Sequence, residues 1–368
     1  MNWTRWASRR CRELEEAGLR RSVRDFDARG PCGRLDGAEV VSFASNDYLG
    51  LGSHPEVVAA ARAALERWGA GAGAARLIVG SRPVHSELER AIADWKHTDA
   101  ALLFPSGYAA NLGVLGALGD ANTLICSDEL NHASIIDGCR LARGRVAVYP
   151  HNDTATLAGL LRSAGRALVV TESVFSMDGD RAPISELAAL CARSGALLVV
   201  DEAHAVLGPE PDLGRAEVVR VGTLSKFVGA AGGFVAGPRS IIDLLTSTAR
   251  AFIFTTASPP SAAAAALQAL RVLRSEEGRA LRARLAELVG RVAPGHPSPI
   301  VPVVLGTEEA ALGAAAGLLE RGLLVPAIRP PTVPPGSARL RVTLSAAHSD
   351  AQVDRLLEAL AALELVGA

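Results

Sequence analysis

The sequence predicts an α/β protein with a mostly parallel sheet in a large domain and a smaller α+β domain at the C-terminal end. Short apolar runs alternate with helical patterns from Pro83 to Glu186, and such alternation is typical of parallel α/β sheets. A further apolar run ends in the polar residues 201–204, where ligands bind in open α/β sheets. Beyond a segment rich in Pro and Gly at residues 294–299, strand patterns alternate with helices again.

Length and composition limit the possible functions. A chain of 368 residues with 49% hydrophobic content is long enough for two or three packed domains. The formal net charge is -1 and the arginines are scattered, which argues against nucleic-acid binding through bulk charge. The five cysteines form no C-x-x-C pair, so reduced thiols are expected.

No targeting or membrane segment is expected. The first 24 residues carry charges throughout and lack the apolar core of a signal peptide. No run of about 18 uncharged apolar residues, the length that crosses a bilayer, occurs in the chain. We therefore expect a soluble, cytoplasmic protein without a membrane partner.

Residues 1–45 are predicted to form an N-terminal arm. An Arg-rich helix is expected within residues 1–25, followed by a connection rich in Gly, Pro and Asp and a strand at residues 40–43. The large domain is expected to comprise residues 46–275 and the small domain residues 276–368.

A helix from Pro55 to Trp68 precedes a glycine-rich segment, residues 69–74, that matches the dinucleotide-binding pattern G-x-G-x-x-A. That pattern must leave a strand and open a helix to bind a dinucleotide, whereas here it leaves a helix. A nicotinamide oxidoreductase is an alternative that depends on this segment alone.

Apolar runs place the strands of the large domain. They predict strands at residues 101–104, 123–126, 146–149, 167–170, 196–200 and 218–221. The chain is expected to become helical after about Arg271. The small domain is then expected to contain strands at residues 300–305, 323–328 and 338–344.

Lysine is nearly absent from the chain. Of the 38 basic side chains, only Lys96 and Lys226 are lysines, and only lysine can lose its proton and act as a nucleophile. Lys96 lies at the polar end of a helical pattern, where a solvated cation near a helix C-terminus accounts for it. Lys226 lies between an apolar run and an uncharged glycine-rich segment, which favours an amine that forms a Schiff base. The alternative is a lysine whose stem covers apolar surface at a strand end.

Pyridoxal phosphate (PLP) needs an amine, an acid facing its pyridine nitrogen, a platform for its ring and donors for its phosphate. Asp201 follows five apolar residues and suits the pyridine nitrogen, although it could instead cap a helix. Residues 106–108 (Ser106, Gly107 and Tyr108) lie between a strand and a helix, where free backbone amides bind anions. Thr223 could add a hydroxyl, and His132 could either stack on the ring or cap a helix.

Several longer segments resemble the α-oxoamine synthases, fold-type I PLP enzymes that condense an amino acid with an acyl-CoA and release carbon dioxide. The matching segments are S-F-A-S-N-D-Y-L-G-L from Ser42, H-N-D from His151, T-E-S-V-F-S-M-D-G-D from Thr171, D-E-A-H from Asp201, T-L-S-K from Thr223 and I-R-P-P-T-V-P-P-G-S-A-R-L-R-V-T-L from Ile328. They span nearly the whole chain.

The resemblance implies roles at the cofactor. Lys226 would form the Schiff base, Asp201 would pair with the pyridine nitrogen and His132 would stack on the ring. The other implied cofactor or site-lining residues are His204 and Ser176 at the phenolic oxygen, Thr223 at the phosphate, and Gly107, Tyr108, Asn46 and Glu172. No metal is expected.

The resemblance also implies substrate contacts. Arg341 would hold the amino acid carboxylate through its planar fork, and Arg20 and Thr332 would contact substrate. Arg329 is the weaker candidate for the acyl-donor side. Alternation along residues 338–342 places Arg339 and Arg341 on the same face of a strand.

The resemblance is strongest to members that use L-alanine and a pimeloyl thioester in biotin synthesis and act as homodimers. The alternatives are relatives that use glycine with a short acyl-CoA, the sphingoid-base enzymes, and a non-catalytic protein that has kept the fold. The chain departs from the family at four positions without losing a reacting group: Ala74, Ala75, Ala205 and Ser225.

Overall fold

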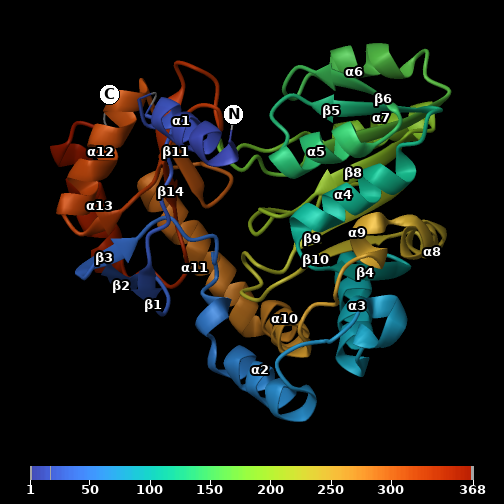
Figure 1. Cartoon of the computed structure of the whole chain (residues 1–368), viewed down its shortest axis with the longest axis horizontal. Coiled ribbons are helices and arrows are strands. Elements are labelled where there is room, and N and C mark those ends of the chain that lie inside the picture. The colour runs from blue at the N-terminus through green and yellow to red at the C-terminus, as the bar shows by residue number, and fades with distance from the viewer. Residues whose placement is uncertain (1, 17, 366–368) are drawn as a thin grey trace.

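The computed structural model describes residues 2–16 and 18–365. Figure 1 shows the C-terminal helices and their sheets on one side of the molecule and a large sheet with its helices on the other. Within the described residues, none of the helices has the length and apolar character needed to span a bilayer.

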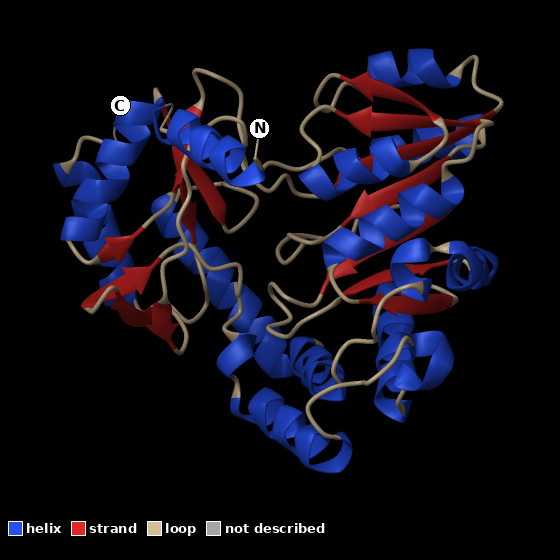
Figure 2. Cartoon of the chain, viewed as in Figure 1, coloured by secondary structure: helices blue, strands red, loops and turns tan. Residues whose placement is uncertain are grey.

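The large domain is built on a seven-stranded sheet with the order β4-β10-β9-β8-β7-β5-β6 (Figure 2). Only β10 runs antiparallel to its neighbours, so the predicted fold class is confirmed. The strands are β4 (Ala100–Phe104), β5 (Thr123–Asp128), β6 (Arg145–Tyr149), β7 (Arg166–Glu172), β8 (Leu197–Asp201), β9 (Val218–Thr223) and β10 (Gly233–Gly237).

Helices cover both faces of this sheet, and their apolar sides contribute to three clusters of buried residues. One face is covered by α4 (Gly107–Leu118), α5 (Ala133–Leu141), α8 (Arg239–Thr248) and α9 (Arg250–Ile253). The other is covered by α3 (Pro83–Lys96), α6 (Thr154–Leu161), α7 (Ile184–Ser194) and α10 (Pro260–Leu273). The last residue of β8, Asp201, shares the α4 side of the sheet with Val199, because side chains alternate along a strand.

The helical region begins earlier than the sequence predicts. It starts at Arg239 with α8 and continues through α9 and α10 to α11 (Glu276–Val292), so the boundary expected near Arg271 is wrong. Alanine-rich sequence with few polar residues obscured the periodicity of α10, in which most of one face is buried.

The small domain has a three-stranded antiparallel sheet of order β11-β14-β13, made by β11 (Ile300–Gly306), β14 (Ala338–Thr343) and β13 (Ala327–Ile328). Its helices are α12 (Glu308–Glu320) and α13 (Asp350–Ala362). The single strand expected at residues 323–328 is wrong. It is divided into β12 (Leu323–Leu324) and β13, which join different sheets on either side of Pro326, a residue without the N–H that a continuous ladder requires.

The N-terminal arm contains α1 (Trp3–Glu16) and three strands of a third sheet, which has four strands. The strands β1 (Phe26–Ala28), β2 (Cys32–Leu35) and β3 (Ala38–Ser42) pair in order, and β3 also pairs with β12. The chain then crosses to the large domain through α2 (Pro55–Trp68) and the turn Arg76–Gly80.

A loop after β7, residues 173–182, extends from the large domain and packs against the small domain. It is called the strap below. Its ends pair through Val174 and Arg181, and its tip lies against β11. Gly179 has a φ of 70°, and a Cβ atom there would lie 2.0 Å from the backbone oxygen of Ile300. Only glycine therefore fits where the strap meets the small domain.

Candidate active site

Lys226 lies in the turn after β9, with its amine directed at the strand ends of the large sheet. Its Nζ atom is 2.7 Å from Nε2 of His204. Burial lowers the pKa of the Lys226 amine, although the carboxylates of Asp201 and Glu172 act in the opposite direction. The amine is therefore closer to its nucleophilic form than an exposed lysine would be.

A continuous hydrogen-bonded chain runs from Lys226 to Arg341. Nδ1 of His204 is 2.5 Å from the hydroxyl of Tyr48, which donates to Oδ1 of Asn46 at 3.0 Å. The same oxygen of Asn46 accepts from two guanidinium nitrogens of Arg341, at 3.3 and 3.2 Å. Burial and the nearby cations Lys226 and Arg341 lower the pKa of His204 well below its usual value. A neutral His204 with its proton on Nδ1 satisfies every bond in this chain.

Asp201 is fixed at the end of β8 on the α4 side of the sheet. Its Oδ2 accepts from Nδ2 of Asn111 at 2.7 Å, and its Oδ1 accepts from the backbone N–H of Ala203 at 2.9 Å. Asn111 also donates to Ser134 at 2.9 Å, and the Ser134 hydroxyl is 2.8 Å from Nδ1 of His132. Asp201 therefore caps no helix, since none follows β8 directly.

His132 is the N-cap of α5 and its side chain stays accessible. Burial of part of the ring lowers the pKa of His132, Asp201 raises it and Lys226 lowers it further. The ring of Tyr108 lies edge-on to the imidazole, with centroids 6.5 Å apart, and the Tyr108 hydroxyl donates to Asp137. His132 can both cap α5 and stack on a ring, because the cap uses only Nδ1 and leaves the face of the imidazole accessible.

The first turn of α4 lies against the end of β9. A Cβ atom on Gly107 would be 3.1 Å from Cβ of Thr223, and one on Gly233 would be 2.4 Å from the Gly107 nitrogen. Ser106 caps the helix and accepts from Ala109 at 3.1 Å, while the hydroxyls of Thr223 and Ser225 are 2.8 Å apart. The free amides of a helix N-terminus and these hydroxyls make an anion site.

Glu172, the last residue of β7, is a buried carboxyl with one oxygen, Oε1, that has no hydrogen-bond partner. Burial and the nearby Asp201 raise the pKa of Glu172 well above its usual value. Lys226 and the backbone amides of His132 and Ser176 lower it. A buried polar atom without a partner is rare in a native protein and points to an additional ligand.

Arg341 on β14 is buried and supported on three sides. Its Nε donates to the backbone oxygen of Ser176 in the strap at 2.6 Å, and a terminal nitrogen donates to Thr343 at 3.0 Å. Its neighbour on the same strand face, Arg339, forms an ion pair with Asp178 of the strap. The two arginines therefore differ, because Arg339 is neutralised by Asp178, whereas the side chain of Arg341 donates to Ser176, Asn46 and Thr343, none of which is acidic.

The structure brings most predicted site residues together, but three substrate candidates lie apart from the Lys226 chain. Arg20 pairs with Glu15 of the arm at 2.8 Å, and Arg329 donates to the backbone oxygen of Gly18. Thr332 lines a cavity of about 470 Å³ between α5, the strap and the proline-rich loop at residues 330–335. Arg20 and Arg329 thus lie near each other on the arm side.

Lys96 is not the solvated cation that its sequence context suggested. It is 3% exposed and forms a 2.7 Å ion pair with Glu202. Arg220 also pairs with Glu202, at 2.8 Å. Glu202 faces away from Asp201, so Lys96 lies behind the turn that carries Asp201 and His204.

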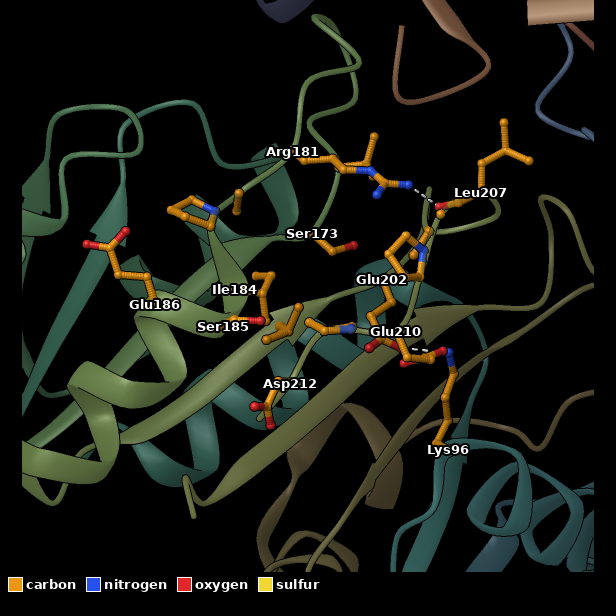
Figure 3. A pocket seen from close by; sticks show the side chains of 18 residues that line it. Lys96, Ser173, Arg181, Ile184, Ser185, Glu186, Glu202, Leu207, Glu210 and Asp212 are labelled. Atoms are coloured by element: carbon orange, nitrogen blue, oxygen red, sulfur yellow. Dashed lines mark hydrogen bonds and ion pairs between the residues drawn. The ribbon is translucent and has the colours of Figure 1, made fainter. Parts of the chain in front are cut away.

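A second cavity of about 490 Å³ lies beside this ion pair, under residues 205–212. Figure 3 shows Lys96 and Glu202 on one side of it and Arg181 and Glu186 on the other. It lies on the sheet face opposite Asp201 and contains none of the residues predicted for the site. No group of three or more His, Cys, Asp or Glu side chains among residues 2–16 and 18–365 is arranged to hold a metal ion.

Sequence reasoning missed Tyr48, Asn111 and Ser134. Tyr48 occurs within the S-N-D-Y-L-G segment, of which only Asn46 was assigned a role, and its side chain is fully buried. Asn111 and Ser134 lie on helices, one turn or less from residues that were predicted. The polar side chain of Asn111 in the apolar first half of α4 was the available signal.

Comparison with known proteins identifies relatives over nearly the whole chain. The model of the family described as aminotransferase class I and II matches residues 38–360. The chain is 53% identical to 8-amino-7-oxononanoate synthase of Anaeromyxobacter dehalogenans, over 97% of this chain and 95% of that protein.

Two solved structures have the same fold. The structure of SPT (serine palmitoyltransferase) with a PLP internal aldimine has a TM-score of 0.90 and 31% identity, covering 98% of both chains. The structure of 8-amino-7-oxononanoate synthase from Francisella tularensis has a TM-score of 0.73 and 28% identity, covering 88% of this chain and 97% of that one.

Proposed function

The chain belongs to the aminotransferase class I and II family and to its α-oxoamine synthases, and from this membership we propose its reaction. It catalyses the PLP-dependent condensation of L-alanine with a pimeloyl thioester in biotin synthesis. The products are 8-amino-7-oxononanoate, carbon dioxide and the free thiol. The observation that carries the proposal is the near full-length relationship to 8-amino-7-oxononanoate synthases.

The residues of the site fit PLP. The amides of Gly107 and Tyr108 with the Thr223 hydroxyl would hold the phosphate, and Asp201 would pair with the pyridine nitrogen. Lys226 would carry the cofactor through its amine. The unpartnered oxygen of Glu172 and the accessible face of His132 are the features expected where a ligand completes the site.

When bound, PLP supplies an electron sink for the bonds to the alanine Cα. A carboxylate at Asp201, held by Asn111 and Ala203, keeps a proton on the pyridine nitrogen. Once the alanine amine has displaced it from the cofactor, the freed Lys226 Nζ would remove the Cα proton, and His204 Nε2, 2.7 Å away, would orient that amine. Arg341 binds the alanine carboxylate and holds it until it leaves as carbon dioxide.

The acyl donor is proposed to enter through the cavity that Thr332 lines. Its wall is largely apolar, with Leu130, Ile136 and Phe175 among the lining residues, which suits a methylene chain. Arg20 and Arg329, on the arm side, are proposed to contact the acyl donor. The basic guanidinium groups match a terminal carboxylate or the phosphates of coenzyme A.

The active form is proposed to be a homodimer in the cytoplasm. Three large apolar side chains are well exposed on neighbouring loops: Ile78 at 73%, Val79 at 68% and Phe254 at 70%. These loops are joined by the bridge between Ala75 and Thr256, so they form one apolar surface that a second copy would cover. A fully active monomer in sedimentation under assay conditions would contradict this proposal.

Thiol release tests the reaction and its rivals together. The purified protein with PLP should release thiol fastest with L-alanine and a pimeloyl thioester, and more slowly with glycine or serine and with acetyl or palmitoyl thioesters. A preference for glycine with acetyl-CoA would favour the glycine-using relatives. A preference for serine with palmitoyl-CoA would favour a sphingoid-base enzyme, the activity that SPT represents.

A further inference from the structure

The H-N-D segment at residues 151–153 has no part in the reaction described above, yet its histidine occupies an unusual position. His151 lies between two carboxylates, with Nδ1 at 3.1 Å from Oδ1 of Asp128 and Nε2 at 2.8 Å from Oδ2 of Asp180. Asp128 is the last residue of β5, and its side chain is completely buried. Asp180 belongs to the strap. The imidazole therefore ties the strap to the large sheet.

The connection is reinforced on each side of His151. The backbone N–H of Asn152 donates to the second oxygen of Asp128 at 2.9 Å, and the Asn152 amide donates to Asp180 at 3.3 Å. The ring of Phe175, at the start of the strap, meets the imidazole edge-on with centroids 4.3 Å apart. All of these partners come from the large domain or the strap.

The strap in turn supports the residue proposed to bind the substrate carboxylate. Between its two ends, the backbone oxygen of Ser176 accepts from Nε of Arg341 at 2.6 Å, and Asp178 pairs with Arg339. Inside the strap, the N–H of Phe175 donates to the oxygen of Asp180 at 3.0 Å. If Asp180 moves, this hydrogen bond transmits the displacement to Phe175, and Ser176 is the next residue along the chain.

We propose that His151 is a positioning residue for the amino acid substrate, acting through Asp180 and the strap on the Ser176 contact that orients Arg341. The proposal rests on the function proposed above, in which Arg341 binds the alanine carboxylate. His151 touches neither substrate nor cofactor in this scheme. Its effect is on the direction of the Arg341 fork, which a bidentate contact requires.

Two N–H donors are needed to bind both carboxylates, and only the protonated imidazole has two. Burial lowers the pKa of His151, but the hydrogen bonds and charges of Asp128 and Asp180 outweigh it and raise the pKa. Other charged groups of the neighbouring segments include Glu129, whose carboxylate accepts from the His151 backbone N–H at 2.8 Å, Arg181, and the carboxylates of Asp153 and Asp178. Deprotonation removes one of the two bonds and loosens the strap.

The link between His151 and its two carboxylates weakens as the pH rises. Because the folded pKa lies above the usual value of 6.5, the link is complete below that pH and is lost as the pH rises through the raised pKa. The KM for L-alanine should therefore increase on the alkaline side. A glutamine at position 151 carries its two N–H donors on a single nitrogen and cannot titrate, so His151→Gln should keep one of the two carboxylate contacts and remove this part of the pH dependence.

The test uses three variants and two kinds of measurement. His151→Leu removes both bonds, His151→Gln keeps donors, and His54→Gln is the matched control, since His54 also pairs with a carboxylate, Glu277 at 3.1 Å, but lies away from the strap. Steady-state kinetics of the PLP-loaded enzymes are measured with varied L-alanine from pH 6 to 9. Amide hydrogen exchange of strap peptides is measured on the cofactor-free proteins.

His151→Leu should raise the KM for L-alanine roughly tenfold, the change that ~1.4 kcal/mol produces, with kcat changed less than about threefold. Its strap amides should exchange faster without cofactor. His151→Gln should give a KM between those of His151→Leu and the parent near pH 7, and its KM should depend less on pH than that of the parent. His54→Gln should match the parent in every measurement. If His151→Leu does not fold, Asp180→Asn serves in its place with the same expected direction.

Unchanged KM and unchanged strap exchange in His151→Leu, or in Asp180→Asn, would overturn the inference. So would an equal loss in kcat and in cofactor binding, which indicates general damage to the fold. A parent enzyme that releases no thiol with L-alanine and a pimeloyl thioester would contradict the proposed function instead, while strap exchange would still report on His151.

Discussion

Tyr48 links the parts of the site that come from different domains. Its hydroxyl is hydrogen-bonded both to His204, which lies beside Lys226, and to Asn46. The side-chain oxygen of Asn46 in turn accepts a hydrogen bond from Arg341. The orientation of the Lys226 amine and that of the Arg341 guanidinium therefore depend on the same buried atom. This coupling could not be predicted from the sequence, because Tyr48 and His204 are 156 positions apart and neither carries a signal of the other.

Tyr48→Phe should reduce kcat/KM for L-alanine by about five- to twentyfold. The change removes one buried hydrogen bond from His204 and one from Asn46, and a net hydrogen bond is worth about 1 kcal/mol. Steady-state kinetics would measure it, with Tyr149→Phe as control because Tyr149 is equally buried outside the site. Identical losses in both variants would show that packing, not the hydrogen-bonded chain, matters at position 48.

Lys96 and Lys226 are both largely buried, but only one is expected to react. Lys96→Met should lower the free energy of unfolding by about 3 kcal/mol, because it leaves Glu202 buried with Arg220 as its remaining close cation. Lys96→Arg should recover much of that loss. Chemical unfolding of the cofactor-free proteins measures both. Lys96→Met should still attach PLP, and failure of attachment in a folded variant would refute the assignment of Lys96 as structural.

Among the elements, the parallel strands were placed well by sequence patterns, because each contains an apolar run that is unbroken except in β9, where Arg220 interrupts it. β10 was missed because Gly233–Gly237 lies in a glycine-rich segment that lacks a β-branched pattern, although every residue of it is buried. The division of residues 323–328 depends on partners far away in the sequence. The local sequence pattern therefore predicts whether a segment is a helix or a strand more reliably than it predicts which sheet a strand joins.

Gly233→Ala should weaken PLP binding. An added Cβ would lie 2.3 Å from the backbone carbon of Ser106 and would force the first turn of α4 away from β9, so the predicted phosphate site would open. We expect at least a tenfold increase in the dissociation constant of PLP, corresponding to ~1.4 kcal/mol. Fluorescence titration would measure it. Gly116→Ala, in the same helix with open space around it, should bind PLP like the parent, and equal affinity in Gly233→Ala would contradict the assignment.

The whole molecule should lose stability on the acid side of neutrality. Burial lowers the pKa values of His85, His132, His204 and His348, so the unfolded chain takes up more protons than the folded one as the pH falls below about 6.5. The stabilisation is complete above that value and is lost towards the lowered folded pKa values. His151 acts in the opposite direction.

Denaturant unfolding of the cofactor-free protein between pH 7.5 and 5.5 measures this effect. The free energy of unfolding should decrease as the pH is lowered. The decrease should be up to about 1.4 kcal/mol per pH unit for each of these histidines that takes up a proton on unfolding. His348→Gln should fall less steeply, because His348 donates to the Ser42 backbone oxygen at 3.0 Å as a buried neutral ring. A free energy that rises as the pH drops would show that these rings are charged in the folded state.

Across the whole chain, the proposed reaction requires one amine, and Lys226 is predicted to supply it. The scarcity of lysine predicted Lys226 from the sequence, and the family relationship establishes PLP as the cofactor. The site roles of the individual residues stay predictions, and attachment of PLP is the one from which the others follow.

Borohydride reduction of the PLP-loaded protein, followed by peptide mass spectrometry, tests this attachment most directly. The reduced pyridoxyl group should be found on the peptide that contains Lys226 and not on the peptide that contains Lys96, and Lys226→Ala should form no stable adduct. A pyridoxyl group on Lys96, or its retention in Lys226→Ala, would refute attachment at Lys226.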